Sequence, residues 1–297
     1  MYKVILDTDI GDDIDDAFAL GLLLKNPNID LIAVTTGFKN TLARAKQAKQ
    51  LINIAKKDIP VYVGETYPLN GKITGFTMDK GDLATIIPCQ YDSSMDDLNV
   101  NINAVDAIIE LAKQHSKEVI VVAIGPITNV ARALQKDPSI AKDIKAIYQM
   151  GGWFTNFVPE WNILCDPEAC DVVYKANIPV YAVGLDVTLK CPLDGSLLTN
   201  LKSSDDEMCK TISTWLQRWF DYFHFEKSIL HDPLAVTAVF EKDVLTFEPK
   251  YVKVVLDGEK RGAMLVSDTY QEGYSLINVA NDVNKELFFN TIGKNFG

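Results

Sequence analysis

Short apolar runs alternate with segments of helical periodicity along most of the chain. The runs are β-branched or aliphatic, which is typical of strands buried on both faces, and they occupy residues 4–6, 31–34, 119–123, 146–148 and 180–183. Apolar residues recur at helical spacing between them, as in residues 17–24 and 42–55. Strands that alternate with helices predict an α/β fold with a single open, mostly parallel sheet flanked by helices.

The remaining segments carry weaker patterns. Residues 66–101 are rich in Gly, Asp, Thr and Ser, which predicts a long loop with one short helix and suggests a lid over a site. Residues 205–227 predict a long aromatic-rich helix, residues 250–280 alternate like paired strands, and residues 283–289 predict a closing helix. With no internal repeat or linker, we treat residues 1–297 as one domain.

The charge of the chain narrows the class of ligand. The formal net charge is −11, and this balance argues against a nucleic-acid partner, because phosphate binding needs a basic surface. It also gives no reason to expect docking on an anionic membrane. A small neutral molecule or a cation fits the acidic balance better.

Cysteine usage and the apolar runs indicate a location. The five cysteines are dispersed and form no CxxC pair, which is typical of reduced thiols rather than a disulfide framework or a zinc cluster. The apolar run before Asp7 is too short for the core of a signal peptide, and no run approaches the length of a membrane span. We therefore expect a cytoplasmic protein.

An acidic turn follows the first predicted strand. Residues 7–16, with the sequence DTDIGDDIDD, hold six aspartates in ten positions. So many carboxylates after a buried strand are unfavourable unless a cation is bound. Oxygen ligands favour calcium or magnesium over zinc, and the closing glutamate of an EF-hand is missing. The alternative, in which Asp12 and Asp13 are solvated and Asp15 caps a helix, explains one or two acids but not six.

Three further motifs each follow a predicted strand or begin a predicted helix. Ligands of parallel sheets bind at such positions. Residues 123–129 read AIGPITN, residues 150–162 begin MGG and end NFVPEWN, and residues 231–235 read HDPLA. Taken singly, the first is explained as a strand-to-helix turn, the second as a surface loop and the third as a helix cap. Their meaning depends on their occurring together.

Together with the acidic turn, these motifs resemble the inosine–uridine preferring nucleoside hydrolase family. The family patterns are D-x-D-x-G…D-D-x-x-A, G-P-L-T-N, M-G-G…N-x-x-P…E-[aromatic]-N and H-D-P/A. This chain has similar segments in the same order between residues 7 and 235, with Ile127 in place of the leucine. The resemblance implies a Rossmann-like nucleoside hydrolase fold. It also implies hydrolysis of the N-glycosidic bond of ribonucleosides to ribose and a free base.

The resemblance further implies a calcium site and a general base. The implied calcium ligands are Asp9, Asp16, Asp232 and the carbonyl of Ile124, and Asp15 is the implied base. In the short family form one residue separates the glycine from the paired aspartates, whereas this chain has three. The longer spacing leaves open whether Asp13 takes the role of Asp15.

Substrate contacts are also implied by the resemblance. His231 is the implied proton donor to the leaving base. Asn156 and Glu160 would bind the 5′ side of the ribose, and Asn162 its diol. The full set of implied substrate-binding residues is Asn40, Met150, Asn156, Glu160, Trp161 and Asn162.

The base preference and two alternative functions complete the expectations. Many purine-accepting members carry a histidine in the long loop, but residues 66–101 contain none, so we expect a preference for pyrimidine nucleosides or for inosine and uridine. Family resemblance implies a homodimer or homotetramer. The alternatives are a metal-binding protein that binds ribose or nucleosides without turnover, and a haloacid-dehalogenase-type phosphatase, whose threonine or serine loop is a poor match here.

Overall fold

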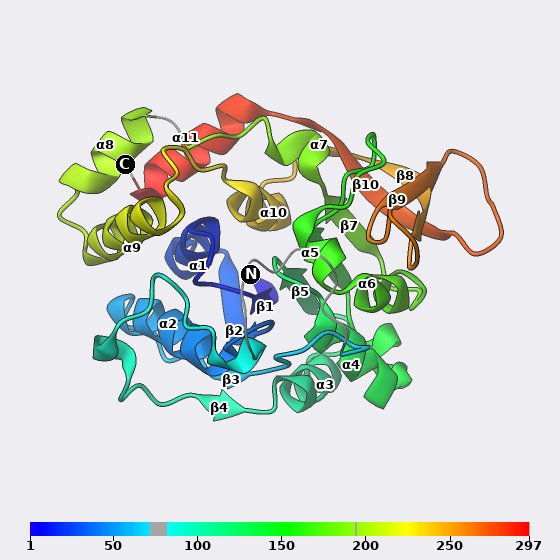
Figure 1. Ribbon diagram of the computed structural model, residues 1–297, viewed down its shortest axis with the longest axis horizontal. Helices are drawn as coiled ribbons and strands as arrows, with labels where there is room; N and C mark the ends of the chain where they lie inside the picture. The colour runs from blue at the N-terminus through cyan, green and yellow to red at the C-terminus, as the bar shows by residue number, and fades with distance from the viewer. Residues whose placement is uncertain (72–81, 194, 297) are drawn as a thin grey trace.

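One ten-stranded sheet organises the chain in the computed structural model, which describes residues 1–71, 82–193 and 195–296 (Figure 1). The strand order is β4-β3-β2-β1-β5-β6-β7-β10-β8-β9. Neighbours from β4 to β10 pair in parallel, whereas β8 and β9 are antiparallel additions at one edge. The strands are β1 (Tyr2–Thr8), β2 (Ile29–Thr36), β3 (Val61–Val63), β4 (Asn101–Ile102), β5 (Val119–Ala123), β6 (Ala146–Met150), β7 (Val180–Val183), β8 (Leu245–Val254), β9 (Met264–Ser267) and β10 (Ser275–Val283). The predicted open, mostly parallel sheet is confirmed.

Helices cover both faces of the sheet, as its continuous apolar strands require. Side chains alternate along β1, so that Val4 and Leu6 join one core and Ile5 the other. The first core includes α1 (Asp15–Lys25), α2 (Thr41–Ile54), α8 (Gly195–Ser203), α9 (Glu207–Phe223), α10 (His231–Phe240) and α11 (Lys285–Phe296). The second core includes α3 (Ala104–Gln114), α4 (Thr128–Lys136) and α6 (Pro167–Tyr174), while α5 (Trp161–Cys165) and α7 (Leu185–Thr188) are short.

Some expected element boundaries are wrong. The aromatic-rich helix is α9, which begins after Asp206 because the Asp206 side chain caps it by accepting from the Cys209 N–H at 3.0 Å. It ends at His224, whose φ of 56° is left-handed, a usual way to stop a helix. The expected closing helix starts too early, because Val283 still pairs with Leu245 in the sheet.

The long loop is described only in part. Residues 82–101 contain two 3₁₀ turns, Leu83–Thr85 and Ser93–Met95, instead of one short helix. Residues 72–81 of the expected lid lie outside the described residues. The lid itself therefore stays a prediction.

The order of strands around β1 predicts a ligand-binding crevice beyond the carboxyl ends of β1 and β5. From β1 the chain continues to β2, β3 and β4 on one side, and then returns to β5 on the other. The β1–β5 boundary is thus a topological switch point, and open α/β sheets bind ligands beyond the carboxyl ends of the strands at such points. Thr8 and Ala123 end these two strands, so the acidic turn continues beyond the end of β1 and the motif of residues 123–129 continues beyond the end of β5.

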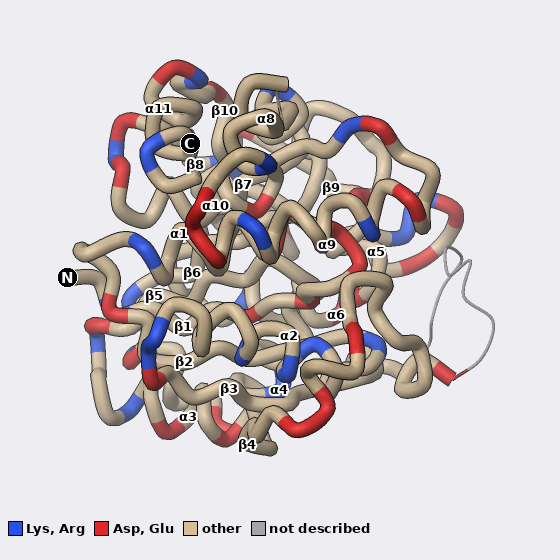
Figure 2. Tube along the Cα trace, turned by 90° about the vertical axis from the view of Figure 1, so that its left-hand side faces the viewer, with Lys and Arg blue, Asp and Glu red and all other residues tan. Residues whose placement is uncertain are grey.

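Charges of both signs are distributed over the chain. Both basic and acidic residues are scattered along the trace (Figure 2). Across the described ranges, no helix combines the length and the apolar character needed to cross a membrane. The acidic turn lies at the carboxyl end of β1, in the middle of the sheet.

Candidate active site

Three buried carboxylates meet beyond the carboxyl end of β1. Asp15, Asp16 and Asp232 each offer an oxygen, and these oxygens all lie within 4.8 Å of one another. All three side chains are at most 3% exposed. We call these residues the carboxylate trio. Asp16 and Asp232 were expected as metal ligands and Asp15 as the base, so the structure brings together residues from both roles.

The carboxylate trio lies at the N-termini of two helices. Asp15 and Asp16 lie in the first turn of α1, and Asp232 lies in the first turn of α10, which packs against α1. A helix N-terminus carries partial positive charge, so it favours carboxylates. The Asp232 N–H donates to Asp15 Oδ2 at 3.0 Å, and the Thr8 hydroxyl donates to Asp16 Oδ1. The trio is therefore held from both helices and from the end of β1.

The trio is electrostatically incomplete without a cation. Burial raises the pKa of Asp15, Asp16 and Asp232 well above the ordinary range, and repulsion from neighbouring aspartates raises each further. A bound cation would reverse this shift by favouring the ionised forms. The donor set, three buried carboxylates, therefore fits a hard divalent cation.

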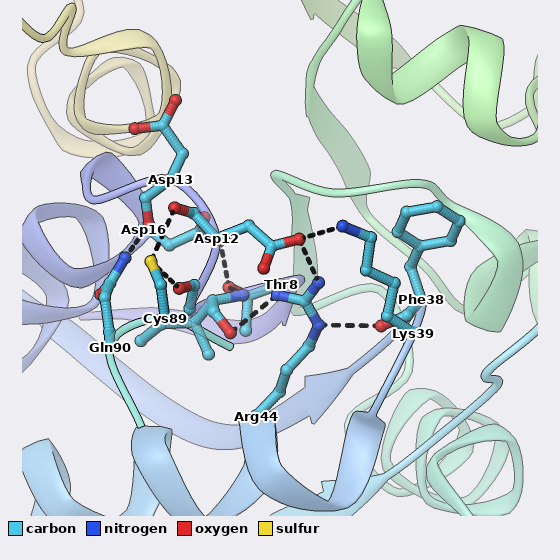
Figure 3. Close-up of polar contacts among 11 residues, drawn as sticks. Thr8, Asp12, Asp13, Asp16, Phe38, Lys39, Arg44, Cys89 and Gln90 are labelled. Atoms are coloured by element: carbon cyan, nitrogen blue, oxygen red, sulfur yellow. Dashed lines mark hydrogen bonds and ion pairs between the residues drawn. The ribbon is translucent and has the colours of Figure 1, made fainter. Parts of the chain in front are cut away.

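The other aspartates of the turn have partners of their own. Asp12 Oδ2 accepts from Arg44 Nη2 at 3.1 Å and pairs with Lys39 (Figure 3). These two cations lower the pKa of Asp12 against the opposing effect of burial. Asp13 points away from them, and its Oδ1 accepts from the Ile14 N–H at 2.6 Å. Part of the negative charge that suggested a metal is thus neutralised by the protein, and Asp15 rather than Asp13 joins the trio.

Asp7 supports the sheet end instead of the trio. Its Oδ1 accepts from Thr35 Oγ1 and from Asn129 Nδ2, both at 2.7 Å. Burial raises the pKa of Asp7 to about 7. Asn129 also donates to the carbonyl of Thr36 at 3.1 Å, so it ties α4 to β1 and β2.

Asp9 lies beside the trio against a glycine. A Cβ placed on Gly125 would come within 2.6 Å of Asp9 Oδ1, so no larger residue fits there without displacing Asp9. Burial raises the pKa of Asp9, while Arg44 and Lys39 act to lower it. Asp9 is therefore a fourth carboxylate at this site, on the side of β5.

Asn162 joins two strand ends. Its Nδ2 donates to the carbonyl of Ile124 at 2.9 Å and to the carbonyl of Met150 at 3.3 Å. Asn162 and Met150 are both buried. Three residues predicted separately from the sequence, one as a ligand and two as substrate contacts, are thus neighbours.

Glu160 is buried and caps α5. Its carboxylate accepts from the N–H groups of Gly152 at 3.0 Å, Asn162 at 2.9 Å and Ile163 at 3.2 Å. Burial raises the pKa of Glu160, while these backbone donors oppose the rise. The carboxylate thus fixes the turn that presents Asn162.

His231 lies next to Asp232 at the start of α10. Its Nδ1 is 2.7 Å from Thr188 Oγ1, and burial lowers the pKa of His231 to about 4. The imidazole is therefore neutral at pH 7. Contact with Thr188 engages one ring nitrogen and leaves Nε2 for another partner.

The remaining predicted substrate residues lie further out. Asn40 caps α2, because its side chain accepts from the Ala43 N–H at 3.0 Å. Asn156 is exposed, and Trp161 is 41% exposed. These positions are compatible with substrate contacts at the rim, and their roles stay predictions.

Sequence reasoning missed three residues that contact the acidic turn from other segments, Arg44, Lys39 and Gln90, and it also missed Thr8 within the turn. Arg44 and Lys39 lie on the segment that follows β2, and Gln90 lies in the long loop and donates to the carbonyl of Asp13. Only the folded chain brings these segments together. The one available signal was the charge of the turn itself, which requires nearby cations as well as a metal.

Comparison with known proteins assigns the chain to a family. The family model described as inosine-uridine preferring nucleoside hydrolase matches residues 4–290. Uridine nucleosidase 1 of Arabidopsis thaliana is 30% identical, over 96% of this chain and 90% of the relative. The inosine-uridine preferring nucleoside hydrolase of Crithidia fasciculata is 32% identical, over 90% of this chain and 87% of the relative.

A solved structure shows the same fold at full length. A plant nucleoside hydrolase aligns with a TM-score of 0.83 and 28% identity, covering 99% of this chain and 98% of that one. The family match spans every motif from the acidic turn to Asp232. The chain therefore belongs to the inosine–uridine preferring nucleoside hydrolase family, and it is a glycosidase that hydrolyses ribonucleosides to ribose and a free base.

Proposed function

We propose that this nucleoside hydrolase depends on calcium bound at the carboxylate trio. The observation that carries the proposal is the approach of three buried carboxylates within 4.8 Å. Oxygen-only donors favour a hard cation, and several carboxylates together suit calcium better than magnesium, which keeps more of its water. When bound, calcium would orient the ribose hydroxyls and lower the pKa of a water molecule.

The geometry supports one change in the expected roles. Asp15 lies in the trio and its Oδ2 already accepts from Asp232, which suits a ligand. Asp9 lies beside the trio against Gly125 and outside the group of three, so we assign its carboxylate to accept a proton. We infer that Asp15, Asp16, Asp232 and the carbonyl of Ile124 hold the cation, and that Asp9 takes the proton from the attacking water. The sequence resemblance gave these roles to Asp9 and Asp15 in the opposite order.

The remaining steps fall to residues around the trio. Water attacks the anomeric carbon as the glycosidic bond breaks, and the clustered carboxylates stabilise the oxocarbenium-like charge that develops on the sugar. The neutral imidazole of His231 donates a hydrogen bond to the leaving base and so stabilises the negative charge that develops on it. We assign the ribose to Asn162, Glu160 and Met150, and the outer contacts to Asn40, Asn156 and Trp161.

We propose uridine and inosine as the preferred substrates. Relatives are named a uridine nucleosidase and an inosine-uridine preferring hydrolase. The lack of histidine in residues 66–101 also supports weak use of other purine nucleosides. We further propose a homodimer or homotetramer and a cytoplasmic location, which sedimentation analysis and cell fractionation would test.

Ribose release decides the proposal. Purified protein would be given inosine, adenosine, guanosine, uridine and cytidine, with calcium, with a chelator, and with calcium restored in excess. We expect release from uridine and inosine that the chelator abolishes and calcium restores. Release that persists unchanged in chelator would contradict calcium dependence. Folded, calcium-loaded protein that releases no ribose from any of the five would favour the binding role.

A further inference from the structure

Arg44 is a fully buried arginine whose guanidinium group donates hydrogen bonds to the acidic turn. Its side chain is 0% exposed, and it comes from α2 rather than from the turn itself. Nη1 donates to the carbonyl of Ile10 at 2.9 Å, and Nη2 donates to Asp12 Oδ2 at 3.1 Å. The two ends of the guanidinium fork therefore hold the turn on both sides of Gly11 (Figure 3).

The same guanidinium also holds the turn after β2. Nε donates to the carbonyl of Phe38 at 2.8 Å. Phe38 and Lys39 have φ values of 62° and 58°, a left-handed conformation that is unfavourable for residues other than glycine. Lys39 adds a second cation on Asp12. Arg44 thus fixes two loops at the β1–β2 edge of the site at once.

A chain of hydrogen bonds links Arg44 to a trio carboxylate. Ile10, whose carbonyl accepts from Arg44, donates its N–H to Thr8 Oγ1 at 3.1 Å. The Thr8 hydroxyl in turn donates to Asp16 Oδ1. The orientation of the Asp16 carboxylate therefore depends on where Arg44 holds the backbone at Ile10.

We propose that Arg44 is a positioning residue that shapes the acidic turn for the cation, and that its geometry rather than its charge sets the calcium affinity. This inference rests on the proposed calcium site. Residues that orient the ligands of a metal without touching it typically change its affinity by ~10–100-fold when they are replaced. Three residues separate Gly11 from the paired aspartates Asp15 and Asp16, and a flexible turn of this length has many conformations that such a brace excludes.

The direction in which calcium affinity changes in Arg44 variants distinguishes a positioning role from a purely electrostatic one. A buried positive charge near a cation site repels the cation, so an Arg44 that acted only through its charge would weaken calcium binding. At a pH where the trio is ionised, its removal in Arg44→Met would then tighten calcium binding. Arg44→Lys keeps the charge but loses the fork, so a charge-only role would leave the affinity unchanged. A positioning role makes both variants bind calcium more weakly.

Isothermal titration of calcium into metal-free protein tests this, with circular dichroism in chelator to confirm folding. We expect Arg44→Lys and Arg44→Met to weaken the calcium Kd at least about tenfold. The matched control is Arg261→Lys, which loses a two-bonded ion pair with Glu168 away from the trio and should stay within about twofold of the wild type. Unchanged affinity in Arg44→Lys, or tighter binding in Arg44→Met, would overturn the inference.

A second variant keeps the test open if the Arg44 variants do not fold. Thr8→Val has nearly the same shape and breaks the same hydrogen-bond chain at its other end, so it should also weaken calcium binding about tenfold. Where Arg44→Lys folds, it can be combined with Thr8→Val in a double variant. The double variant should lose less calcium-binding free energy than the two single variants lose together, because both substitutions act through Ile10. Wild-type affinity in Thr8→Val would contradict the chain. A wild type that binds no calcium would instead remove the proposed cation site.

Discussion

The backbone N–H of Asp232 donates a 3.0 Å hydrogen bond to Oδ2 of Asp15, across 217 positions of sequence. This bond joins the first turns of α1 and α10, so the trio forms only when these two helices have docked. Because the donor belongs to the backbone, substitutions at Asp232 other than proline retain it. Asp15 is therefore oriented by the fold itself, and its carboxylate faces Asp16 and Asp232.

The roles of Asp9 and Asp15 can be separated by paired amide substitutions. We expect Asp9→Asn to retain calcium and to lose about 10²–10⁴-fold in kcat, as for loss of a general base. Asp15→Asn should weaken calcium binding as well, because it removes a carboxylate from the trio. Calcium titration of both variants, beside ribose release at saturating calcium, makes the comparison.

Asp12→Asn is the matched control, because Asp12 is in the same turn but pairs with Arg44 and Lys39. Its effect on kcat should be much smaller than that of Asp9→Asn. The opposite pattern, with calcium lost in Asp9→Asn and retained in an inactive Asp15→Asn, would restore the assignment made from the sequence.

Much of the fold and of the trio was accessible from sequence because the patterns are local. Buried parallel strands are continuous apolar runs, so β1, β2, β5, β6 and β7 were found, and ligands of such sheets follow strand ends. The family resemblance implied Asp16 and Asp232 as ligands of one cation although they are far apart in the chain, and the structure brings their carboxylates together. The family match decides against the phosphatase alternative in the same way, since it spans residues 4–290.

The parts that could not be predicted depend on long-range contacts. Nothing in the sequence around Arg44 indicates that it lies buried beneath Ile10 and Asp12. Likewise, Glu160 was expected at the ribose, and only the structure shows that its carboxylate accepts three backbone N–H groups. Which acid accepts a proton depends on displacements of a few ångströms, which residue spacing does not specify.

Calcium should stabilise the protein more at high pH than at low pH. The carboxyls of Asp15, Asp16 and Asp232 have a raised pKa in the folded protein, above the ordinary value of 3.8. Above pH 3.8 the unfolded chain loses these protons more readily, so metal-free protein loses stability as pH rises through the raised pKa values. Bound calcium offsets the repulsion among the ionised carboxylates. At a free calcium concentration of 100 times the Kd, binding adds about 2.7 kcal/mol to the free energy of unfolding.

Thermal unfolding with calcium and with chelator, at intervals from pH 5 to pH 8, measures this difference. We expect the increase in Tm on adding calcium to grow across that range. In Asp16→Asn the increase should be smaller at every pH, because one ionisable carboxylate of the trio is gone. A calcium effect that is independent of pH in the wild type would contradict the raised pKa values.

Gly125→Ala should impair catalysis through Asp9. The added methyl would lie 2.6 Å from Asp9 Oδ1, so the carboxylate must move. Displacement of a catalytic group by about 1 Å can lower the rate ~10²-fold, and the crowding should destabilise the fold by ~1–3 kcal/mol. Gly293→Ala is the control, since a Cβ there meets nothing within 4 Å and α11 should gain ~0.5–1 kcal/mol. Wild-type kcat in Gly125→Ala would show that Asp9 tolerates displacement.

His231 should matter only for substrates whose base needs a proton or hydrogen bond to leave. Burial lowers the pKa of His231 to about 4, so the group is neutral above that pH and its contribution should not decline as pH rises from 5 to 8. For His231→Ala we expect a loss of ~10²–10⁴-fold in kcat on inosine and little loss on a nitrophenyl riboside, whose leaving group needs no protonation. Thr188→Val, which removes the hydroxyl 2.7 Å from His231 Nδ1, should give a smaller loss of the same selectivity. Equal losses on both substrates in His231→Ala would exclude the donor role and leave His231 as a packing residue beside Asp232.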